Sequence, residues 1–441
     1  MERALWGMYL ALAAAAVLQA FLLALQTWEH RRFARSRMLE LDRPRPRGRA
    51  AVFCPCKGVD VGLQNNLRAI LRQDYADYEV VFIVERADDP ACGLLRRMVA
   101  EHPHVKTRLV IAGPATGCGQ KVHNLRAGTA NLDPGIQYVV FVDSDARPRS
   151  QWLRSLLRLD RPGIGASTGY RWFIPTRPTL ANSLLYSINC GIALMFGPSR
   201  YHLIWGGSWA MRRELFEELG VREAWKGTLS DDLVVSRLVR RAGLGIIYQP
   251  PCMVASPLDY PGSAMLSFLR RQYLVGRFYA PRHWLMGLAT STIVNLVMLA
   301  SLVLTASGLV TGRPPFWIPL GVLVALYGIG VFRGSIRQSL TTLFFPSLQP
   351  VLRGVRRFDV WVGPLASLVN WIGIVSSLLG REMVWRGFRY RLSRGGQIQL
   401  VGRGPAAEEA HETEEDLPAE LRAIAGPAAG ADRAIRQKKA G

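Results

Sequence analysis

The chain has 441 residues, with 55 lysines and arginines against 33 aspartates and glutamates, a net charge of +22 and 49% hydrophobic residues. This length exceeds one small domain, and its apolar residues gather in long blocks beside arginines, which indicates a membrane protein. We find no recognisable nucleic-acid-binding module, so we expect no nucleic-acid partner despite the positive charge. The six cysteines lack metal-binding spacing and predict free thiols in a reducing compartment.

The first apolar block, residues 5–25, contains no charged residue. At about 1.5 Å per residue, a helix of this length crosses a hydrocarbon core of about 30 Å. A cleaved signal peptide is the alternative interpretation, but the apolar run continues without a clean cleavage site. We therefore predict a transmembrane anchor over residues 1–30. Arginines follow it directly, so the positive-inside rule places the next domain in the cytoplasm.

Residues 31–50 contain many arginines and two prolines, and we interpret them as a basic linker near anionic headgroups. From residue 51, short apolar strands alternate with helices, a pattern that predicts an α/β domain with a mostly parallel sheet over residues 51–283. Ligands of such folds bind at the carboxyl ends of the strands. Strands are expected at 51–54, 79–84, 107–112 and 138–142, and helices at 63–72, 92–101 and 121–130.

The C-terminal third contains a second membrane region, which we place at residues 284–380 with two to four segments. Spans are predicted at 284–310, 316–332 and 360–379. Residues 339–352 contain two prolines and are too short to cross unaided, which favours an interfacial or re-entrant position. Arginines flank both ends of the third span, which a single crossing does not explain. Residues 381–404 form an Arg-rich segment, and residues 405–441 are predicted to be a disordered tail.

Asp143, Ser144 and Asp145 directly follow the apolar strand predicted at 138–142. Two carboxylates on one tight turn can bind a divalent cation that prefers oxygen ligands, and such a cation would neutralise a leaving diphosphate. A turn or helix cap is the alternative for the same residues. Their position at the end of a strand favours the metal site.

Asp231 and Asp232 begin a further predicted helix, where one carboxylate can cap the helix and the other can act as a general base. Lys121 and Asn124 lie on the helix after a glycine-rich turn and are candidates for contacts with phosphate and nucleotide. The acidic pair ending in Asp89 is a helix cap in the simplest interpretation.

Several segments, in the same order, resemble the ceramide glucosyltransferase family, a group of inverting enzymes with a GT-A fold. The resemblance covers about residues 50–400. The segments that carry it are Lys57-Gly58-Val59-Asp60, Asn65-Asn66-Leu67, Asp88-Asp89-Pro90-Ala91, Lys121 with Asn124-Leu125, Asp143-Ser144-Asp145, Gly207-Ser208 with Met211-Arg212, Asp232, and Trp385-Arg386-Gly387 with Arg389-Tyr390-Arg391-Leu392.

The resemblance implies transfer of a hexose from a UDP-sugar, UDP-glucose first, to the hydroxyl of a ceramide-like membrane lipid with inversion. It also implies Mg²⁺ or Mn²⁺ at Asp143 and Asp145, and Asp232 as the catalytic base. The expected donor-binding residues are Lys57, Asp89, Lys121, Asn124, Asp143, Arg271 and Arg277. The expected acceptor region comprises Gly207, Ser208, Trp209 and Asp231, although core packing is the safer interpretation for the tryptophan.

One departure from the family concerns the segment before the C-terminal membrane helices. The family has (Gln/Arg)-x-x-Arg-Trp there; Arg271 fits the first position, but Leu274-Val275 replace Arg-Trp. Arg277 and Phe278, about one helical turn later, are expected to substitute, with a headgroup-binding patch as the alternative. The acceptor therefore stays open. Transfer of N-acetylglucosamine from its UDP-sugar to a hopanoid is the main alternative, and a processive polysaccharide synthase or a non-catalytic membrane scaffold are lesser ones.

Overall fold

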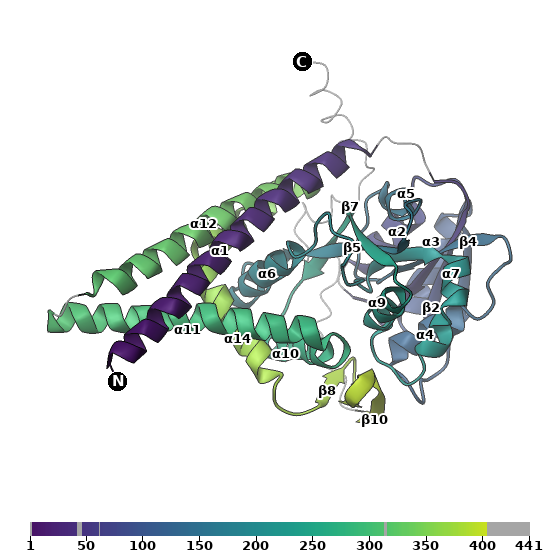
Figure 1. Ribbon diagram of the computed structural model, residues 1–441. Helices are drawn as coiled ribbons and strands as arrows, with labels where there is room; N and C mark the ends of the chain where they lie inside the picture. Colours follow the sequence, from purple (N-terminus) through teal and green to yellow (C-terminus); the bar gives the residue numbers. More distant parts are fainter. Residues whose placement is uncertain (1, 42–45, 61, 313–314, 404–441) are drawn as a thin grey trace, which may run out of the picture.

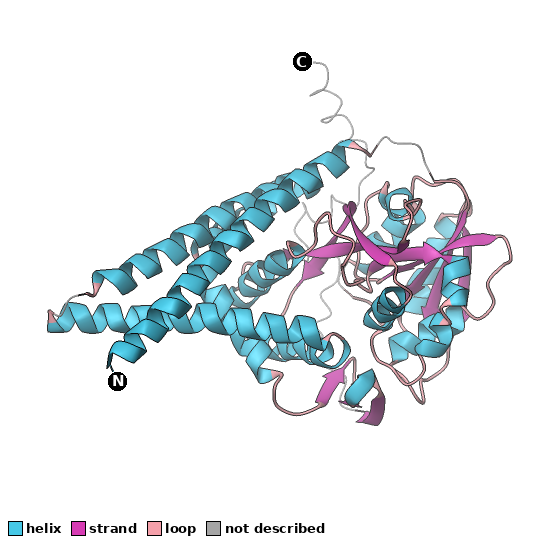
Figure 2. Cartoon of the chain, in the orientation of Figure 1, coloured by secondary structure: helices cyan, strands magenta, loops and turns pink. Residues whose placement is uncertain are grey.

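The computed structural model describes residues 2–41, 46–60, 62–312 and 315–403. An α/β domain lies beside a group of long helices that come from both ends of the chain (Figure 1). Most strands belong to that domain, and a short second sheet forms near the end of the described residues (Figure 2). The predicted α/β architecture with apolar helices at both ends is confirmed. The tail predicted over residues 405–441 lies outside the described residues.

Within the described chain, the large sheet has seven strands in the order β3-β2-β1-β4-β6-β5-β7. Strand β6 is antiparallel to its neighbours and the other pairs are parallel. The carboxyl ends of the parallel strands therefore share one edge of the sheet, where ligands bind in folds of this kind. The strands are β1 (Arg49–Pro55), β2 (Tyr78–Val84), β3 (Lys106–Ile111), β4 (Ile136–Val142), β5 (Ile164–Pro175), β6 (Ser208–Arg212) and β7 (Gly245–Leu258).

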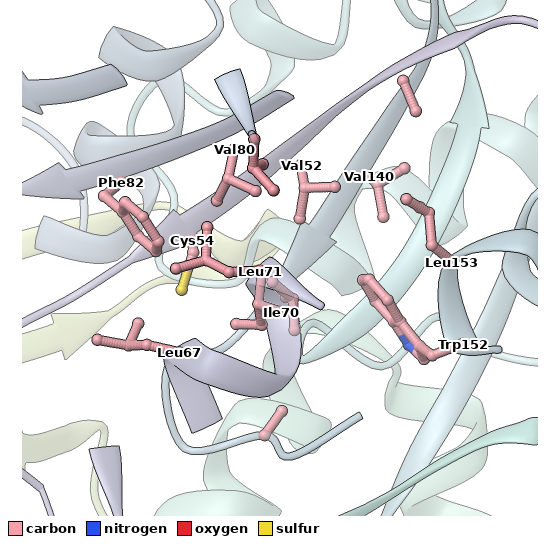
Figure 3. Close-up of a cluster of buried hydrophobic side chains, with 14 of the residues drawn as sticks. Val52, Cys54, Leu67, Ile70, Leu71, Val80, Phe82, Val140, Trp152 and Leu153 are labelled. Atoms are coloured by element: carbon pink, nitrogen blue, oxygen red, sulfur yellow. The ribbon is translucent and has the colours of Figure 1, made fainter. Parts of the chain in front are cut away.

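Helices cover both faces of this sheet because successive strand residues point to opposite sides. Val52 and Cys54 of β1 pack in a cluster with Leu67 and Leu71 (Figure 3), whereas Phe53 packs on the other face. The first face carries α2 (Leu63–Leu71), α3 (Ala91–Glu101) and α5 (Trp152–Leu156). The second carries α4 (Gln120–Gly128), α7 (Arg213–Glu218), α8 (Val221–Ala224) and α9 (Asp231–Arg241).

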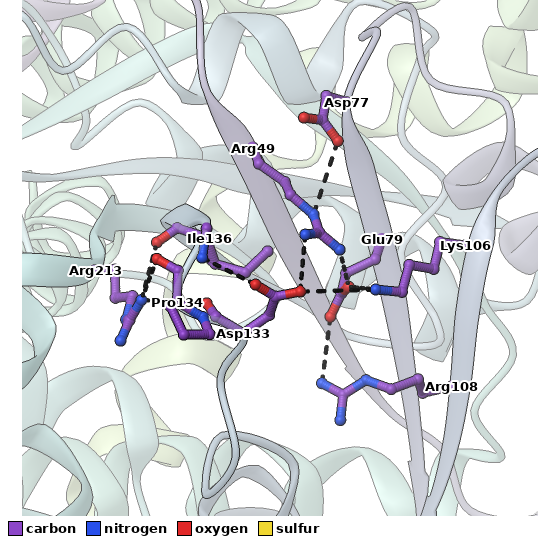
Figure 4. A network of polar contacts seen from close by, with 10 residues as sticks. Arg49, Asp77, Glu79, Lys106, Arg108, Asp133, Pro134, Ile136 and Arg213 are labelled. Carbon is purple, nitrogen blue, oxygen red and sulfur yellow. Dashed lines mark hydrogen bonds and ion pairs between the residues drawn. The ribbon is translucent and has the colours of Figure 1, made fainter.

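An ion-pair network closes the amino-terminal edge of the sheet (Figure 4). The buried carboxylate of Glu79 lies 3.0 Å from Arg49, 3.3 Å from Arg108 and 3.4 Å from Lys106. Arg49 also lies 2.8 Å from Asp133. The network borders a cavity of about 590 Å³. Its cations are already paired with carboxylates, and the edge lies opposite the one that carries Asp143, so we assign it a structural role.

Three of the described helices are long and apolar enough to cross a membrane: α1 (Glu2–Leu39), α11 (Pro281–Thr311) and α12 (Trp317–Phe344). They pack together through small residues such as Ala13 and Ala16, which lie in one cluster with Val297 and Leu326. Small side chains allow such close helix packing in membranes. The first turn of α1, the last turn of α11 and the first turn of α12 lie at the same end of this bundle (Figure 1). Two of the predicted spans are thus confirmed as helices, with α12 extending well past residue 332.

Helix α1 does not end where the anchor was predicted to end. It continues to Leu39, so a linker beginning at residue 31 is wrong in its first part. The reason is packing: Ala34 is fully buried against the α/β domain, and the ring of Phe33 lies 6.5 Å from that of Tyr248 on β7. Tertiary contacts on one side of the helix stabilise it, and the arginines on the other side do not oppose it, because arginine is a good helix former.

The segment predicted as a third span, residues 360–379, is divided in the structure. After a short turn at Pro346–Leu348, α13 (Gln349–Trp361) and α14 (Gly363–Ser376) follow each other with a bend of 81°. Residues 339–344, which we expected in an interfacial element, belong to α12. Helices α6 (Leu180–Ala193) and α10 (Gly262–Tyr279) connect this region with the α/β domain, and α6 is largely buried in the clusters that it shares with β5, α12 and α13.

The Arg-rich segment of residues 381–404 folds, in its described part, as a three-stranded antiparallel sheet of β8 (Glu382–Trp385), β9 (Phe388–Leu392) and β10 (Ile398–Arg403). This C-terminal sheet belongs to the α/β domain. Met383, Phe388, Tyr390 and Leu392 complete the core around α4 and α9, and Ile398 donates a backbone hydrogen bond of 2.8 Å to Gly227.

Candidate active site

A buried lysine joins two acidic segments at the carboxyl edge of the sheet. The Nζ atom of Lys121, on α4, lies 2.7 Å from Oδ1 of Asp143 and 3.2 Å from Oδ1 of Asp231. Burial by itself would lower the pKa of Lys121, but the charges of Asp143, Asp231 and Asp232 outweigh it and raise this pKa above its ordinary value. The lysine is therefore a permanent cation at this edge of the sheet.

The carboxyl group of Asp231 is only partly satisfied. Burial raises its pKa to about 7, with Lys121 opposing the shift and the neighbouring charges of Asp232 and Asp143 adding to it. Its Oδ2 atom is buried and has no hydrogen-bond partner in the described structure. Asp231 thus has both a fixed oxygen, held by the lysine, and an oxygen open to a further partner.

Asp232 is held by three donors. Its Oδ2 accepts a hydrogen bond of 2.8 Å from the backbone N–H of Gly206, and its Oδ1 accepts from Ser230 at 2.5 Å and from the N–H of Leu233 at 2.7 Å. A Cβ atom at position 206 would lie 3.1 Å from this carboxylate and 3.0 Å from Nζ of Lys121. The glycine therefore lets the β5–β6 connection approach both charged groups, and the half-buried Asp232 carboxylate has one fixed orientation.

A residue of α2 holds the turn with Asp143 and Asp145 in place. The amide of Asn66 donates a hydrogen bond of 2.9 Å to the carbonyl of Ser144. Burial, reinforced by the charge of Asp143, raises the pKa of Asp145 to about 6, and Oδ1 of Asp145 is buried without a partner in the described structure. Within the described residues no group of three or more His, Cys, Asp or Glu side chains is arranged so that it could hold a metal ion by itself. Two carboxylates nevertheless fit Mg²⁺ or a similar ion, which commonly takes one or two carboxylates and fills its other positions with phosphate oxygens and water.

Two further predicted donor residues, Lys57 and Asp89, lie on the neighbouring loops that follow β1 and β2. Nζ of Lys57 lies 3.3 Å from Glu85, 4.4 Å from the ring centroid of Phe388 and 3.4 Å from the carbonyl of Arg386, to which it donates. Oδ1 of Asp89 accepts hydrogen bonds of 2.9 Å from the N–H groups of Gly58 and Ala91. Asp89 thereby fixes the loop that carries Lys57.

Asn124 is buried on α4, where its Oδ1 accepts a hydrogen bond of 2.8 Å from Gln120. Gly207 lies beside the turn of Asp143 and Asp145, since its carbonyl accepts a hydrogen bond of 3.4 Å from the N–H of Asp143. Arg271 lies on α10, with its guanidinium 5.4 Å from the ring centroid of Phe268.

Three predicted site residues lie outside the group of polar side chains around Lys121. Trp209 is fully buried and stacks on Phe141 at a ring distance of 4.1 Å, so core packing is its role and its place in the acceptor region is wrong. Ser208 is also fully buried, and its Oγ accepts a hydrogen bond of 2.8 Å from Trp152. Both belong to β6, where these consecutive residues point to opposite faces of the sheet, and each face is covered by helices.

Arg277 is the third predicted site residue that lies outside this group. Its guanidinium donates to the carbonyls of Ser377, Leu378 and Gly380, at the end of α14, at 2.8, 2.9 and 3.2 Å. It therefore caps that helix, as cations commonly do at a helix C-terminus. The structure thus gives Arg277 carbonyl partners near the end of α14, and its expected substitution for the missing Arg-Trp pair stays a prediction. Leu274, at one of those positions, is fully buried in the core.

Sequence reasoning missed two features. Arg386 donates two hydrogen bonds to Asp60 and so attaches the C-terminal sheet to the loop of Lys57. Arg171 lies among aromatic rings on β5, and its charge acts on the carboxyl of Asp145. A lone arginine within the apolar strand of residues 164–175 was the signal available in the sequence.

A match to a protein-family model decides the classification of this arrangement. The family described as "Glycosyl transferase family 21" matches residues 10–398, which include the acidic residues above, the membrane helices and most of the C-terminal sheet. The chain belongs to glycosyl transferase family 21. With the mostly parallel mixed sheet, this family 21 match confirms the expected GT-A fold and the resemblance to ceramide glucosyltransferases.

Curated relatives of this family 21 chain include two ceramide glucosyltransferases. One, from Komagataella phaffii, is 29% identical over 107 residues, which are 22% of this chain and 21% of the relative. Ceramide glucosyltransferase 1 of Caenorhabditis elegans is 27% identical over 75 residues, 17% of this chain and 16% of the relative. The chain thus spans about a fifth or less of the length of the curated relatives it matches.

Solved structures with a similar arrangement include a mannosyltransferase from Pyrobaculum calidifontis in complex with GDP-Man and Mn²⁺. It has a TM-score of 0.44 and 18% identity, and the match covers 80% of this family 21 chain and 99% of that chain. Glucosyl-3-phosphoglycerate synthase from Mycobacterium tuberculosis, in complex with Mn²⁺ and UDP-glucose, has a TM-score of 0.32 and 16% identity, with coverage of 52% and 78%.

Proposed function

We propose that this protein transfers a hexose, glucose first, from a UDP-sugar to the hydroxyl of a membrane lipid of the ceramide type, with inversion at the anomeric carbon. The observation that carries the proposal is the joining of Asp143, Asp231 and Asp232 around Lys121 at the carboxyl edge of the sheet. That edge is where α/β folds bind nucleotides. The family match and the ceramide glucosyltransferases among the relatives support the reaction class and the acceptor.

We assign the donor to the side of the site formed by Lys57, Lys121, Asn124 and Asp143. Lys121 supplies positive charge beside the position proposed for the diphosphate, and Asp89 orients the loop of Lys57. Asp143 and Asp145 would hold Mg²⁺ or Mn²⁺, which when bound supplies further positive charge to the leaving diphosphate.

We assign the role of general base to Asp232. The acceptor hydroxyl gives its proton to this carboxylate as its oxygen attacks the anomeric carbon, and the bond from that carbon to the diphosphate oxygen breaks. Asp232 suits the role better than Asp231 because it is less buried, whereas Asp231 is bound to Lys121 and is 3% exposed. Three hydrogen bonds fix the direction of the base before the acceptor arrives.

The protein is proposed to be an integral membrane protein with its α/β domain in the cytoplasm. The C-terminal sheet contacts that domain, so residues 281–380 must cross the bilayer an even number of times. Helices α11 and α12 supply two crossings, and the 81° bend suits α13 and α14 to a re-entrant pair. The arginines before and after residues 360–379 then lie on the same side of the membrane, which a single crossing by that segment did not allow.

Transfer by the purified protein in lipid nanodiscs tests the proposal. The protein is incubated with Mn²⁺ and single UDP-sugars, with ceramide, a hopanoid or a diacylglycerol in the nanodisc, and the lipids are examined by mass spectrometry. We expect one hexose added to ceramide by the unmodified protein and none by the Asp232→Asn variant. If only the hopanoid receives a sugar, the acceptor is a hopanoid and not ceramide. If the Asp232→Asn variant transfers the sugar as fast as the unmodified protein, Asp232 is not the base.

A further inference from the structure

Arg171 is a cation held by aromatic rings where β5 lies beside α10. It lies on β5, and its Cζ atom is 4.6 Å from the ring centroid of Phe173, 5.8 Å from that of Phe268 and 5.9 Å from that of Trp205. The rings come from β5, α10 and the β5–β6 connection. Three elements thus converge on one guanidinium.

Those rings stabilise the charge but leave the buried Nε donor of the guanidinium without a partner. An aromatic face attracts a cation, yet it offers no strong acceptor for the five N–H groups of an arginine. Nε of Arg171 is buried without a hydrogen-bond partner, and we find no hydrogen bond or ion pair to this side chain among the described residues. Burying such a group is costly unless a partner is supplied. The arrangement is therefore suited to an anionic ligand.

The position of Arg171 indicates which anion it can meet. It pairs with Val254 on β7, and the carbonyl of the next residue, Ala255, accepts a hydrogen bond of 3.1 Å from the N–H of Arg147, two residues after Asp145. Trp205, which it contacts, is followed by Gly206, the residue that donates to Asp232. Arg171 therefore lies near both the metal-binding turn and the base, between which the bond of the donor sugar is broken under the proposed function.

We propose that Arg171 is a diphosphate-binding residue, whose guanidinium donates hydrogen bonds to the diphosphate of the nucleotide-sugar donor and holds it as it leaves. The inference rests on the proposed function. The planar fork of an arginine matches phosphate oxygens in a two-bonded geometry, and the rings hold that fork in place before the ligand binds. Its charge adds to that of Lys121, which lies 2.7 Å from Asp143.

Calorimetric titration of the full chain in nanodiscs, with Mn²⁺ present, tests this role by comparing UDP with uridine, which lacks the phosphates. We expect Arg171→Gln to weaken UDP binding about tenfold or more and to leave uridine binding unchanged. Arg171→Lys, which keeps the charge and loses the fork, should give a smaller loss. Arg200→Gln, at an exposed arginine near the ring of Tyr201, is the matched control and should bind both ligands as the unmodified protein does.

Thermal unfolding of each variant establishes that the comparison is made on folded protein, and Arg171→Met, which keeps an apolar stem among the rings, replaces the glutamine variant if that one does not fold. Unchanged UDP affinity in the folded variant overturns the inference, as does an equal loss for UDP and uridine. Unchanged UDP affinity with weaker binding to vesicles of anionic phospholipid also overturns it and assigns Arg171 to a lipid headgroup. An unmodified protein that binds no nucleoside diphosphate contradicts the proposed function instead.

Discussion

The guanidinium of Arg386 donates hydrogen bonds of 3.1 and 2.9 Å to the two carboxylate oxygens of Asp60, a residue 326 positions earlier in the chain. Arg386 has a φ of 48° and Gly387 a φ of 79°, as the two-residue turn between β8 and β9 requires. Arginine is an unfavourable residue for the left-handed region. The ion pair offsets that cost and attaches the C-terminal sheet to the loop of Lys57.

Reversing one charge of this pair should weaken donor binding. In Arg386→Asp, repulsion from Asp60 separates the hairpin from the loop, and Lys57 loses its contacts with Phe388 and the carbonyl of residue 386. We expect about a tenfold loss of UDP affinity by calorimetry, partly restored in the double variant Asp60→Arg with Arg386→Asp. Arg391→Ala, which removes a pair with Glu382 in the same sheet, is the control. Equal losses in Arg386→Asp and Arg391→Ala would contradict the specific role of this pair.

Asp232→Asn should lower the transfer rate at least about 100-fold, because a general base contributes roughly that much or more, while UDP-sugar affinity stays close to that of the unmodified protein. The measurements are product formation by mass spectrometry and donor binding by calorimetry. Asp231→Asn should reduce both quantities, since it removes a partner of Lys121. If Asp231→Asn lowers only the transfer rate and Asp232→Asn lowers both the rate and the UDP-sugar affinity, the base is Asp231.

Asp143→Ala should weaken binding of UDP in the presence of Mn²⁺ and have little effect when a chelator is present. The reason is that the metal proposed at Asp143 and Asp145 binds the donor through its phosphates. Calorimetric titrations with Mn²⁺ and with EDTA measure the two affinities. Equal UDP binding by the unmodified protein under both conditions shows a structural role for this turn.

The raised pKa of Asp231 makes its contribution to stability depend on pH. Burial raises this pKa from 3.8 to about 7, so between these values the folded state keeps a proton that the unfolded state releases. The contribution of this group to the free energy of unfolding is then present below about pH 4 and falls as pH rises to about 7. We expect the stability of Asp231→Asn relative to the unmodified protein to increase across this range in thermal unfolding. A difference that does not change with pH contradicts the shift.

Trp209→Ala should destabilise the α/β domain by about 3–5 kcal/mol, the usual cost of removing a buried aromatic side chain. Trp209→Phe should cost much less, because the ring still packs on Phe141 and the indole N–H that is lost has no partner in the described structure. Unfolding of both variants in urea gives the comparison. Loss of acceptor affinity in a stable Trp209→Phe protein would return this residue to the acceptor region.

Regular patterns made much of the fold predictable. Residues 138–142, the part of β4 before Asp143, are all apolar because helices cover both faces of the sheet. The acidic turn begins where this strand ends. Gly363-Pro364 contained a signal for the break between α13 and α14, since the residue before a proline disfavours helix. That signal was outweighed by the apolar composition around it.

The remaining features depend on contacts that are distant in sequence. Arg277 and Arg171 have the same side chain, but one meets helix carbonyls and the other meets aromatic rings. No local pattern distinguishes these environments. The helical conformation of residues 31–39 likewise follows from packing on β7 rather than from the composition of that segment.

The C-terminal sheet has a consequence for the biosynthesis of the protein. Its strands complete the core beside α4 and hold the loop of Lys57, although Arg386 is translated 329 residues after Lys57. Between them lie all the helices from α11 to α14. Under the proposed function and membrane placement, a nascent chain cannot assemble the proposed donor side of the site until those helices have been translated and inserted, which couples the acquisition of activity to the completion of membrane insertion.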